Sequence, residues 1–148
     1  MTDTVTGGCQ CGRVRYAVAI DDDDAYLCHC RMCQRATGGV SIAFKGVRKS
    51  ALTWTTREPD RYASSPFANR GFCSNCGTPL TYERPDAAGM DLTVGSFDDP
   101  SAFVPESHSG VESWHPAWLD TRGLATERTE DNAPIIAKWI ETGGRVPD

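Results

Sequence analysis

The sequence has no cluster of basic residues and no long apolar run. Its 15 Lys and Arg residues are outnumbered by 20 Asp and Glu residues, so its formal net charge is −5. A protein that binds the phosphate backbone of nucleic acid needs a positively charged face. No apolar stretch approaches the roughly 20 residues that cross a bilayer. We therefore expect neither a nucleic-acid partner nor a membrane partner.

The first residues also lack the features of a secretory signal. Residues 1–6 are polar and include an acid, with no apolar segment after them. We therefore expect a cytoplasmic protein. In that reducing compartment, clustered cysteines are metal ligands or redox thiols rather than structural disulfides. The odd count of seven cysteines also argues against complete internal pairing.

The composition indicates a small protein that is rich in turns. The 148 residues fit a single domain, residues 1–148, and only 39% of them are hydrophobic. With 14 Gly and 9 Pro, much of the chain must be turn and loop. We expect part of the stability to come from bound metal.

Apolar residues alternate with other residues over several short stretches, which is typical of half-buried strands. The clearest stretch is 13–20, where Val14, Tyr16 and Val18 share one face. We predict further strands at 40–44, 52–54, 61–63, 80–82 and 92–97. We expect a turn at Lys45-Gly46, a solvated hairpin loop at the acids 21–24, and loop for the rest of 57–69.

Helical patterns are short. Helical turns are predicted at 34–38 and 98–103, and no periodicity is clear over 105–128. At the end of the chain, residues 134–140 place apolar groups at helical spacing, with Asn132 as N-cap, Pro134 in the first turn and Gly143 as a stop. The sequence therefore predicts a mainly β protein of short antiparallel sheets with one short C-terminal helix.

The cysteines dominate the sequence. Cys28, Cys30 and Cys33 fall within six residues with C-x-C-x2-C spacing, and the other four form two glycine-flanked pairs, Cys9/Cys11 and Cys73/Cys76. Structural zinc takes four ligands, whereas catalytic zinc takes three protein ligands and keeps an open position. We therefore predict a closed zinc site of Cys9, Cys11, Cys73 and Cys76, and an open zinc site of Cys28, Cys30 and Cys33.

The open site is where chemistry is expected. An incoming thiol loses its proton more readily at a metal and becomes a nucleophile at neutral pH. Arg31 and Arg35 flank the cluster and are candidates to offset its negative charge or to hold a substrate carboxylate. His29 lies between two ligands, and we favour a hydrogen-bonded structural role over that of a proton shuttle. The roles of His108 and His115 stay open.

Two other functions use the same residues. Cys30 and Cys33 form a C-x2-C pair that could cycle through a disulfide, although no thioredoxin-like βαβ pattern surrounds them. A zinc module without enzymatic activity is the other alternative, because no clear general base stands beside the thiols in the sequence.

Three stretches resemble the glutathione-dependent formaldehyde-activating enzyme family, also called the centromere protein V/GFA domain. They are Gly7-Gly8-Cys9-Gln10-Cys11-Gly12-Arg13-Val14-Arg15-Tyr16, Cys28-His29-Cys30-Arg31-Met32-Cys33-Gln34-Arg35 and Phe72-Cys73-Ser74-Asn75-Cys76-Gly77-Thr78-Pro79-Leu80. The resemblance runs in order from about residue 5 to about residue 125 and keeps all seven thiols.

The resemblance implies a β-tent zinc-binding fold with two zinc ions per chain. It implies a structural zinc on Cys9, Cys11, Cys73 and Cys76 and a catalytic zinc on Cys28, Cys30 and Cys33. It also implies a carbon–sulfur lyase with glutathione as cosubstrate, which condenses formaldehyde with glutathione to S-hydroxymethylglutathione. The partners would then be a small-molecule thiol and an aldehyde. Arg35 is the candidate for binding the cosubstrate by its position beside the thiols.

Overall fold

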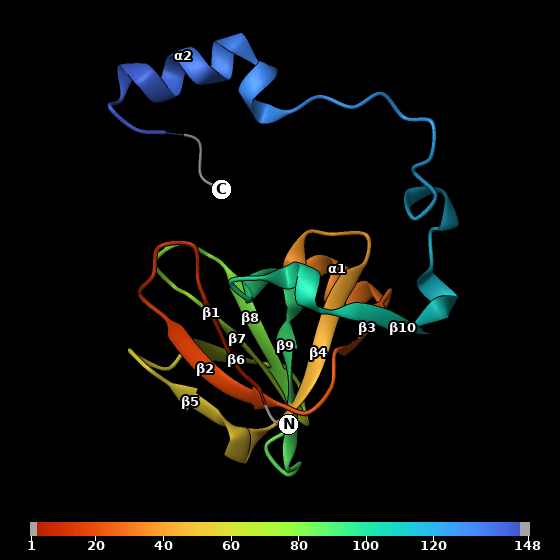
Figure 1. The fold of residues 1–148 in the computed structure, drawn as a ribbon. Helices are drawn as coiled ribbons and strands as arrows, with labels where there is room; N and C mark the ends of the chain where they lie inside the picture. The colour runs from red at the N-terminus through yellow and green to blue at the C-terminus, as the bar shows by residue number, and fades with distance from the viewer. Residues whose placement is uncertain (1–2, 146–148) are drawn as a thin grey trace. The chain divides into compact units, whose positions relative to one another are not determined.

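The computed structural model describes residues 3–145, and strands dominate this range (Figure 1). The chain divides into two compact units, Met1–His115 and Pro116–Asp148. The first unit holds ten strands: β1 (Asp3–Gly8), β2 (Arg15–Ile20), β3 (Asp24–Cys28), β4 (Ile42–Arg48), β5 (Leu52–Trp54), β6 (Asp60–Ser65), β7 (Ala68–Phe72), β8 (Pro79–Glu83), β9 (Gly89–Thr93) and β10 (Val104–Ser109). Its one α-helix in the described range is α1 (Arg31–Thr37).

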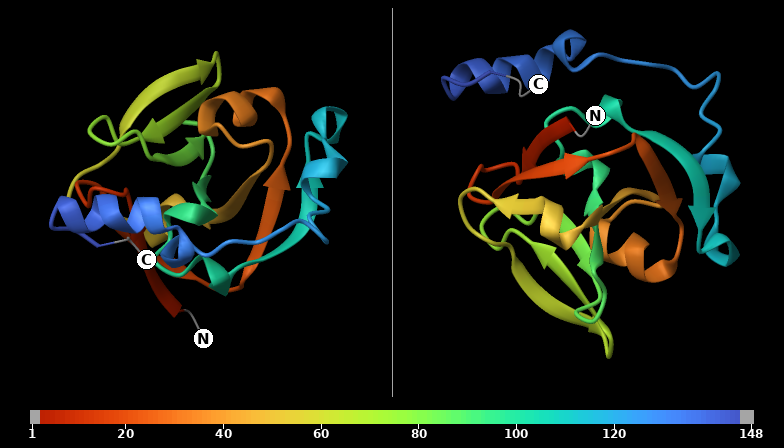
Figure 2. Two further views of the ribbon diagram at one scale, coloured as in Figure 1. Left: turned by 90° about the horizontal axis from the view of Figure 1, so that it is seen from above. Right: turned by 60° about the horizontal axis from the view of Figure 1, so that its bottom comes forward.

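The strands form two sheets. The smaller sheet has the order β1-β2-β5, and the larger has the order β10-β3-β4-β9-β8-β7-β6. All neighbouring strands are antiparallel except β10 and β3, which run parallel. Figures 1 and 2 show the smaller sheet beside the larger one and α1 beside β4. The predicted mainly β fold with a short C-terminal helix is confirmed.

The apolar core joins the two sheets. From the smaller sheet it takes the buried side chains of Tyr16 and Val18, as the alternation over 13–20 predicts, and from β9 it takes Leu92. The ring of Tyr16 meets the rings of Trp54 and Phe97 edge to face, with centroids 5.8 and 5.5 Å away. The Tyr16 hydroxyl is hydrogen-bonded to the Ser96 hydroxyl at 2.8 Å, so its buried polar end is satisfied.

The second unit contains α2 (Ala133–Glu141) and two single 3-10 turns. The predicted helix is confirmed: the Asn132 side chain accepts a hydrogen bond from the N–H of Ile135, Pro134 lies in the first turn, and Gly143 follows with φ 70°. Within the described range, no helix is both long enough and apolar enough to span a bilayer. The assignment of residues 1–148 to a single domain stays a prediction.

The turn predicted at Lys45-Gly46 is wrong, because β4 continues through both residues to Arg48. Lys45 is only 2% exposed and forms ion pairs with Asp22 and Asp24 of the acidic run. A lysine that looked like a turn residue is thus a strand residue whose charge is neutralised. The acids 21–24 are exposed, as predicted, but the loop is not that of a hairpin, because β2 and β3 belong to different sheets, and Asp24 already belongs to β3.

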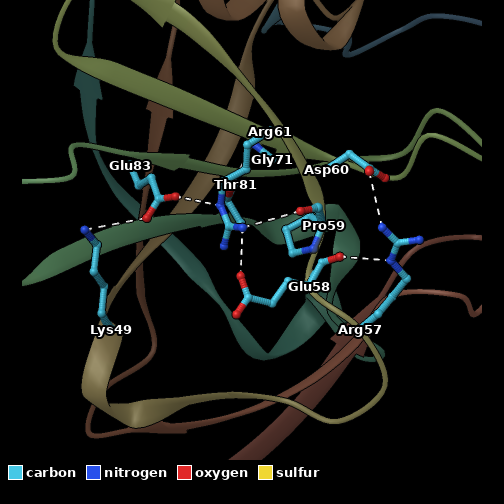
Figure 3. A network of polar contacts seen from close by, with 9 residues as sticks. All are labelled: Lys49, Arg57, Glu58, Pro59, Asp60, Arg61, Gly71, Thr81 and Glu83. Carbon is cyan, nitrogen blue, oxygen red and sulfur yellow. Dashed lines mark hydrogen bonds and ion pairs between the residues drawn. The ribbon is translucent and has the colours of Figure 1, made fainter.

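For the stretch 57–69 the sequence predicts loop with a strand only at 61–63, but β6 and β7 form a hairpin there. Ion pairs hold this polar hairpin in place (Figure 3): Arg61 contacts Glu83 and Glu58, and Glu83 also pairs with Lys49. Asp60 accepts hydrogen bonds from the backbone and the hydroxyl of Ser74, which connects β6 to the turn of Cys73 and Cys76. Charged side chains therefore stabilise strands that hydrophobic alternation does not reveal.

Other boundaries also differ from prediction. α1 begins at Arg31 rather than at residue 34, and the strand predicted over 92–97 ends at Thr93 before a 3-10 turn at Val94–Ser96. No sequence pattern predicts β1, β3 or β10, whose exposed or irregular patterns do not alternate. The 3-10 turn at Pro100–Ala102 fulfils the helical turn predicted at 98–103.

Candidate metal centres

The first cluster joins the beginning of the chain to its middle. The sulfurs of Cys9, Cys11, Cys73 and Cys76 lie within 4.8 Å of one another. The Sγ atoms of Cys9 and Cys11 are 3.5 Å apart, and those of Cys11 and Cys73 are 3.7 Å apart. Four sulfurs at the usual Zn–S length of about 2.3 Å in a tetrahedron would be about 3.8 Å apart. The donor set therefore fits a tetrahedral metal ion.

Hydrogen bonds support this four-thiol cluster on two sides. The N–H of Val14 donates to Cys9 Sγ at 3.2 Å, and the Thr78 hydroxyl lies 3.2 Å from Cys76 Sγ. The contact with Thr78 is the main cause that lowers the pKa of Cys76 to about 5. Burial acts in the opposite direction on Cys73 and raises its pKa to about 11. The cluster thus contains one thiol that ionises readily, Cys76, and one whose thiolate form a cation beside it would stabilise, Cys73.

The second cluster lies where β3 passes into α1. Cys28 ends β3, Cys30 is the N-cap of α1, and Cys33 lies in its first turn. Their three sulfurs also lie within 4.8 Å of one another. Cys28 and Cys33 are buried, at 7% and 5% exposure, whereas Cys30 is partly exposed. This three-thiol cluster therefore has three converging donors and one accessible side.

The thiols of the second cluster ionise differently. Burial raises the pKa of Cys33 to about 12, which a hydrogen bond from Arg70 opposes. Burial also disfavours ionisation of Cys30, but hydrogen bonds, led by that from the N–H of Cys33, outweigh it and lower its pKa. A metal ion would favour the thiolate form of all three.

His29 lies between two of the thiols and is completely buried. Its Nε2 atom is 2.9 Å from Nδ1 of His108 on β10, and its ring stacks on Trp114 with centroids 5.4 Å apart. Its Nδ1 atom has no hydrogen-bond partner among the described residues. The geometry agrees with the hydrogen-bonded structural role favoured for His29. It also places His108 against it, while His115 is exposed.

Of the arginines, the structure brings to the three-thiol cluster one that the sequence did not suggest. Arg70, in the middle of β7, donates from Nη2 to Cys33 Sγ at 3.2 Å. Arg31 instead donates to Gln34 within α1, and Arg35 is exposed in the last turn of that helix. A role for Arg35 in holding a substrate stays a prediction. Arg70 is 37 residues from Cys33, so only the strand register could have revealed it.

Residues of β2, β4, β8 and β9 line a cavity of about 680 Å³, and none of the seven cysteines is among its lining residues. Tyr82 lines this cavity and packs against the apolar cluster of Cys28, Cys33 and Phe44. On β9, Asp91 pairs with Tyr82 of β8 on one side and with Gly46 of β4 on the other, and it also lines the cavity. Burial raises the pKa of Asp91, and a hydrogen bond with Tyr26 opposes that shift. The cavity is large enough for a small-molecule ligand.

Comparison with known proteins now identifies the family. The sheets and cysteine clusters define a mainly β protein with two potential metal centres. The family model described as glutathione-dependent formaldehyde-activating enzyme matches residues 4–113, and the chain belongs to this family. The matched range contains all seven cysteines and Arg70.

Individual proteins that are similar to this chain include the following two. The uncharacterized lyase C29B12.13 of Schizosaccharomyces pombe is 33% identical over 76 residues, which are 51% of this chain and 55% of that protein. The chain therefore matches about half the length of this relative. The crystal structure of a Rhodobacter sphaeroides protein has a TM-score of 0.57 and 22% identity, and covers 70% of this chain and 99% of its own. This second likeness concerns the fold alone.

Proposed function

We propose that this protein is a zinc-dependent carbon–sulfur lyase that joins a glutathione-like thiol reversibly to an aldehyde. The observation that carries the proposal is the convergence of three sulfurs, Cys28, Cys30 and Cys33, within 4.8 Å and with one side accessible. Membership in the glutathione-dependent formaldehyde-activating enzyme family and a relative named as a lyase support it. Formaldehyde is the aldehyde that the family's description suggests.

In this proposal the two clusters have different tasks. Cys9, Cys11, Cys73 and Cys76 hold a structural zinc ion, and Cys28, Cys30 and Cys33 hold a catalytic one. A zinc ion with three thiolate ligands supplies an open position and lowers the pKa of a thiol that reaches it. The partly exposed Cys30 marks the side from which a substrate arrives.

The reaction is an addition that needs no oxidant. The substrate sulfur forms a bond to the aldehyde carbon, the carbonyl π bond breaks, and the thiol proton ends on the new hydroxyl oxygen. The protein binds and orients the thiol beside α1 and keeps water from the buried side, where Cys28 and Cys33 are covered.

The test is turnover of a thiol–aldehyde adduct by wild type and Cys30→Ser. We expect Cys30→Ser to lose at least about 100-fold in activity while the fold survives, because removing a metal ligand removes the activated thiol. Met32→Ser changes an exposed neighbour in α1, and we expect it to keep wild-type activity. A folded Cys30→Ser protein with full activity would refute the proposal. Tightly bound zinc without turnover in wild type would favour a non-enzymatic zinc module.

A second candidate function has one specific observation in its favour. Cys30 caps α1 and accepts from the N–H of Cys33 at 3.4 Å, so a C-x2-C pair stands at a helix N-terminus. In a dithiol reductase these two thiols would be oxidised to a disulfide while a substrate disulfide is reduced to two thiols. Thiol counts that change by two during such a cycle would support it. Zinc that stays bound to all three thiols throughout would exclude it.

A further inference from the structure

Arg70 is a buried cation without a carboxylate partner among the described residues. Its exposure is 5%, and its guanidinium contacts Cys33 Sγ at 3.2 Å and lies over the Tyr82 ring, 5.0 Å from the ring centroid. An arginine keeps its positive charge in proteins. Because a buried charge is costly unless it is paired, the fold must provide a negative group for Arg70.

Several other arginines in the described range have carboxylate partners and are more exposed. Seven of them form ion pairs with Asp or Glu, and their side chains are 31% to 91% exposed: Arg15, Arg48, Arg57, Arg61, Arg84, Arg122 and Arg128. Arg70 is far more buried than these, and its polar contact is a sulfur of the three-thiol cluster. The contrast indicates that the negative group for Arg70 is the metal-loaded cluster itself.

We propose that Arg70 is a positioning residue that completes the three-thiol cluster by balancing its charge and fixing the direction of the Cys33 sulfur. Three thiolates and a divalent cation carry a net charge of −1, which one guanidinium brings to zero. Groups that bond to metal ligands from outside orient those ligands and strengthen metal binding. The inference rests on the metal-binding role proposed above for Cys28, Cys30 and Cys33.

The sheet holds Arg70 firmly in this position. It stands opposite Tyr82 on β8 and Tyr62 on β6, so all three side chains share one face. Beside it, Gly71 donates its N–H to Thr81 Oγ1 at 3.0 Å, and a Cβ at Gly71 would come within 2.4 Å of that oxygen. β7 and β8 are therefore closely packed at Arg70, and the Tyr82 ring supports the guanidinium through a cation–π contact.

The test measures metal binding rather than activity alone. Zinc dissociation constants of both clusters are measured by chelator competition, and the cobalt-substituted proteins are compared by their visible absorption. For Arg70→Met we expect about 10- to 100-fold weaker binding at the three-thiol cluster, an altered cobalt spectrum, and unchanged binding at the four-thiol cluster. Arg70→Lys keeps the charge but not the planar fork, and we expect it to restore part of the affinity.

The matched control is Arg61→Met. It removes an arginine from the neighbouring strand whose partners are Glu83 and Glu58 (Figure 3), and we expect no change at the three-thiol cluster. Tyr82→Leu removes the supporting ring, and we expect an intermediate loss of affinity. If Arg70→Met does not fold, Arg70→Lys and Tyr82→Leu decide the question.

Unchanged zinc affinity and an unchanged cobalt spectrum in folded Arg70→Met would overturn the inference, as would unchanged values in both Arg70→Lys and Tyr82→Leu. The proposed function would stand in that case if wild type turns over thiol–aldehyde adducts. Conversely, weakened zinc binding in Arg70→Met without any turnover by wild type would support the role of Arg70 and reject the lyase.

Discussion

The two cysteine clusters use the same donor atom in different surroundings. The four-thiol cluster joins two turns, includes the exposed Cys11, and is supported by backbone and hydroxyl groups. The three-thiol cluster lies against the larger sheet, with two buried sulfurs and a buried arginine. The two clusters therefore differ in their surroundings as well as in their number of thiols. The first cluster ties distant segments together, whereas the sulfurs of the second come from one short segment, residues 28–33, where β3 passes into α1.

The largest expected effect breaks the four-thiol cluster. We expect Cys73→Ser to unfold the protein, because structural zinc contributes on the order of 10 kcal/mol to folding, comparable to the whole stability of a typical domain. Far-UV circular dichroism and zinc content measure the result. Ser74→Ala is the neighbouring control and loses only the exposed hydrogen bond to Asp60, worth about 1 kcal/mol. A Cys73→Ser protein with wild-type stability would remove the distinction between the clusters.

A smaller effect is expected where β10 meets the three-thiol cluster. His108→Ala deprives the buried Nε2 of His29 of its hydrogen-bond partner, and we expect it to cost about 1 to 3 kcal/mol in the free energy of unfolding. Urea unfolding of the zinc-loaded protein provides the measurement. His115→Ala, an exposed histidine, is expected to change stability by less than about 0.5 kcal/mol. Equal effects of the two substitutions would contradict the structural role of His29.

The smallest effect concerns the exposed ion pair of Arg15 and Asp98, which contrasts with the buried Arg70. Arg15 donates to both carboxylate oxygens of Asp98, and this contact is the main cause that lowers the pKa of Asp98 to about 2. The two side chains are 33% and 48% exposed, so we expect Asp98→Asn to cost less than about 1 kcal/mol at pH 7. Raising the salt concentration should reduce that cost. A cost above 3 kcal/mol would mean that the greater exposure of this ion pair does not make it weaker than the contacts of the buried Arg70.

The pH dependence of the Asp98 contribution follows from the sign of its shift. The folded-state pKa of about 2 lies below the ordinary value of about 3.9. The pair therefore stabilises the protein fully above about pH 4, and this contribution is lost as the pH falls toward 2. An NMR titration of the Asp98 carboxyl in wild type and Arg15→Met checks the cause, since the pKa should rise toward 3.9 in the variant.

The sequence allowed the two sets of cysteines to be predicted, and the structure brings the same two sets of sulfurs together. The spacing of the cysteines within each motif is a local property of the sequence, so it can be interpreted without knowledge of the fold. Val14, Tyr16 and Val18 were predictable as buried for the same reason, since strict alternation marks one face of a strand.

Other features depend on contacts between distant residues. In the sequence, Lys45 resembles a turn residue because it is charged and precedes a glycine. In the structure, Asp22 and Asp24 neutralise its charge, so it can be buried in a strand. β7 lacks an alternating pattern, and its pairing with β8 places Arg70 opposite Tyr82. Proximity to the thiols in the sequence suggests Arg31 and Arg35 as the cations of the site. In the structure, the register of the strands instead brings Arg70 to Cys33. Register is set by the whole sheet and is not visible in any short motif.

The central claim is that seven thiols divide into one closed and one open zinc site. Elemental analysis of zinc per chain in wild type and in Cys30→Ser, before and after zinc is added back, tests it most directly. We expect two zinc ions in wild type and one in a folded Cys30→Ser protein. One zinc ion in both proteins, unchanged after zinc is added back, would contradict the claim and leave Cys28, Cys30 and Cys33 as free thiols.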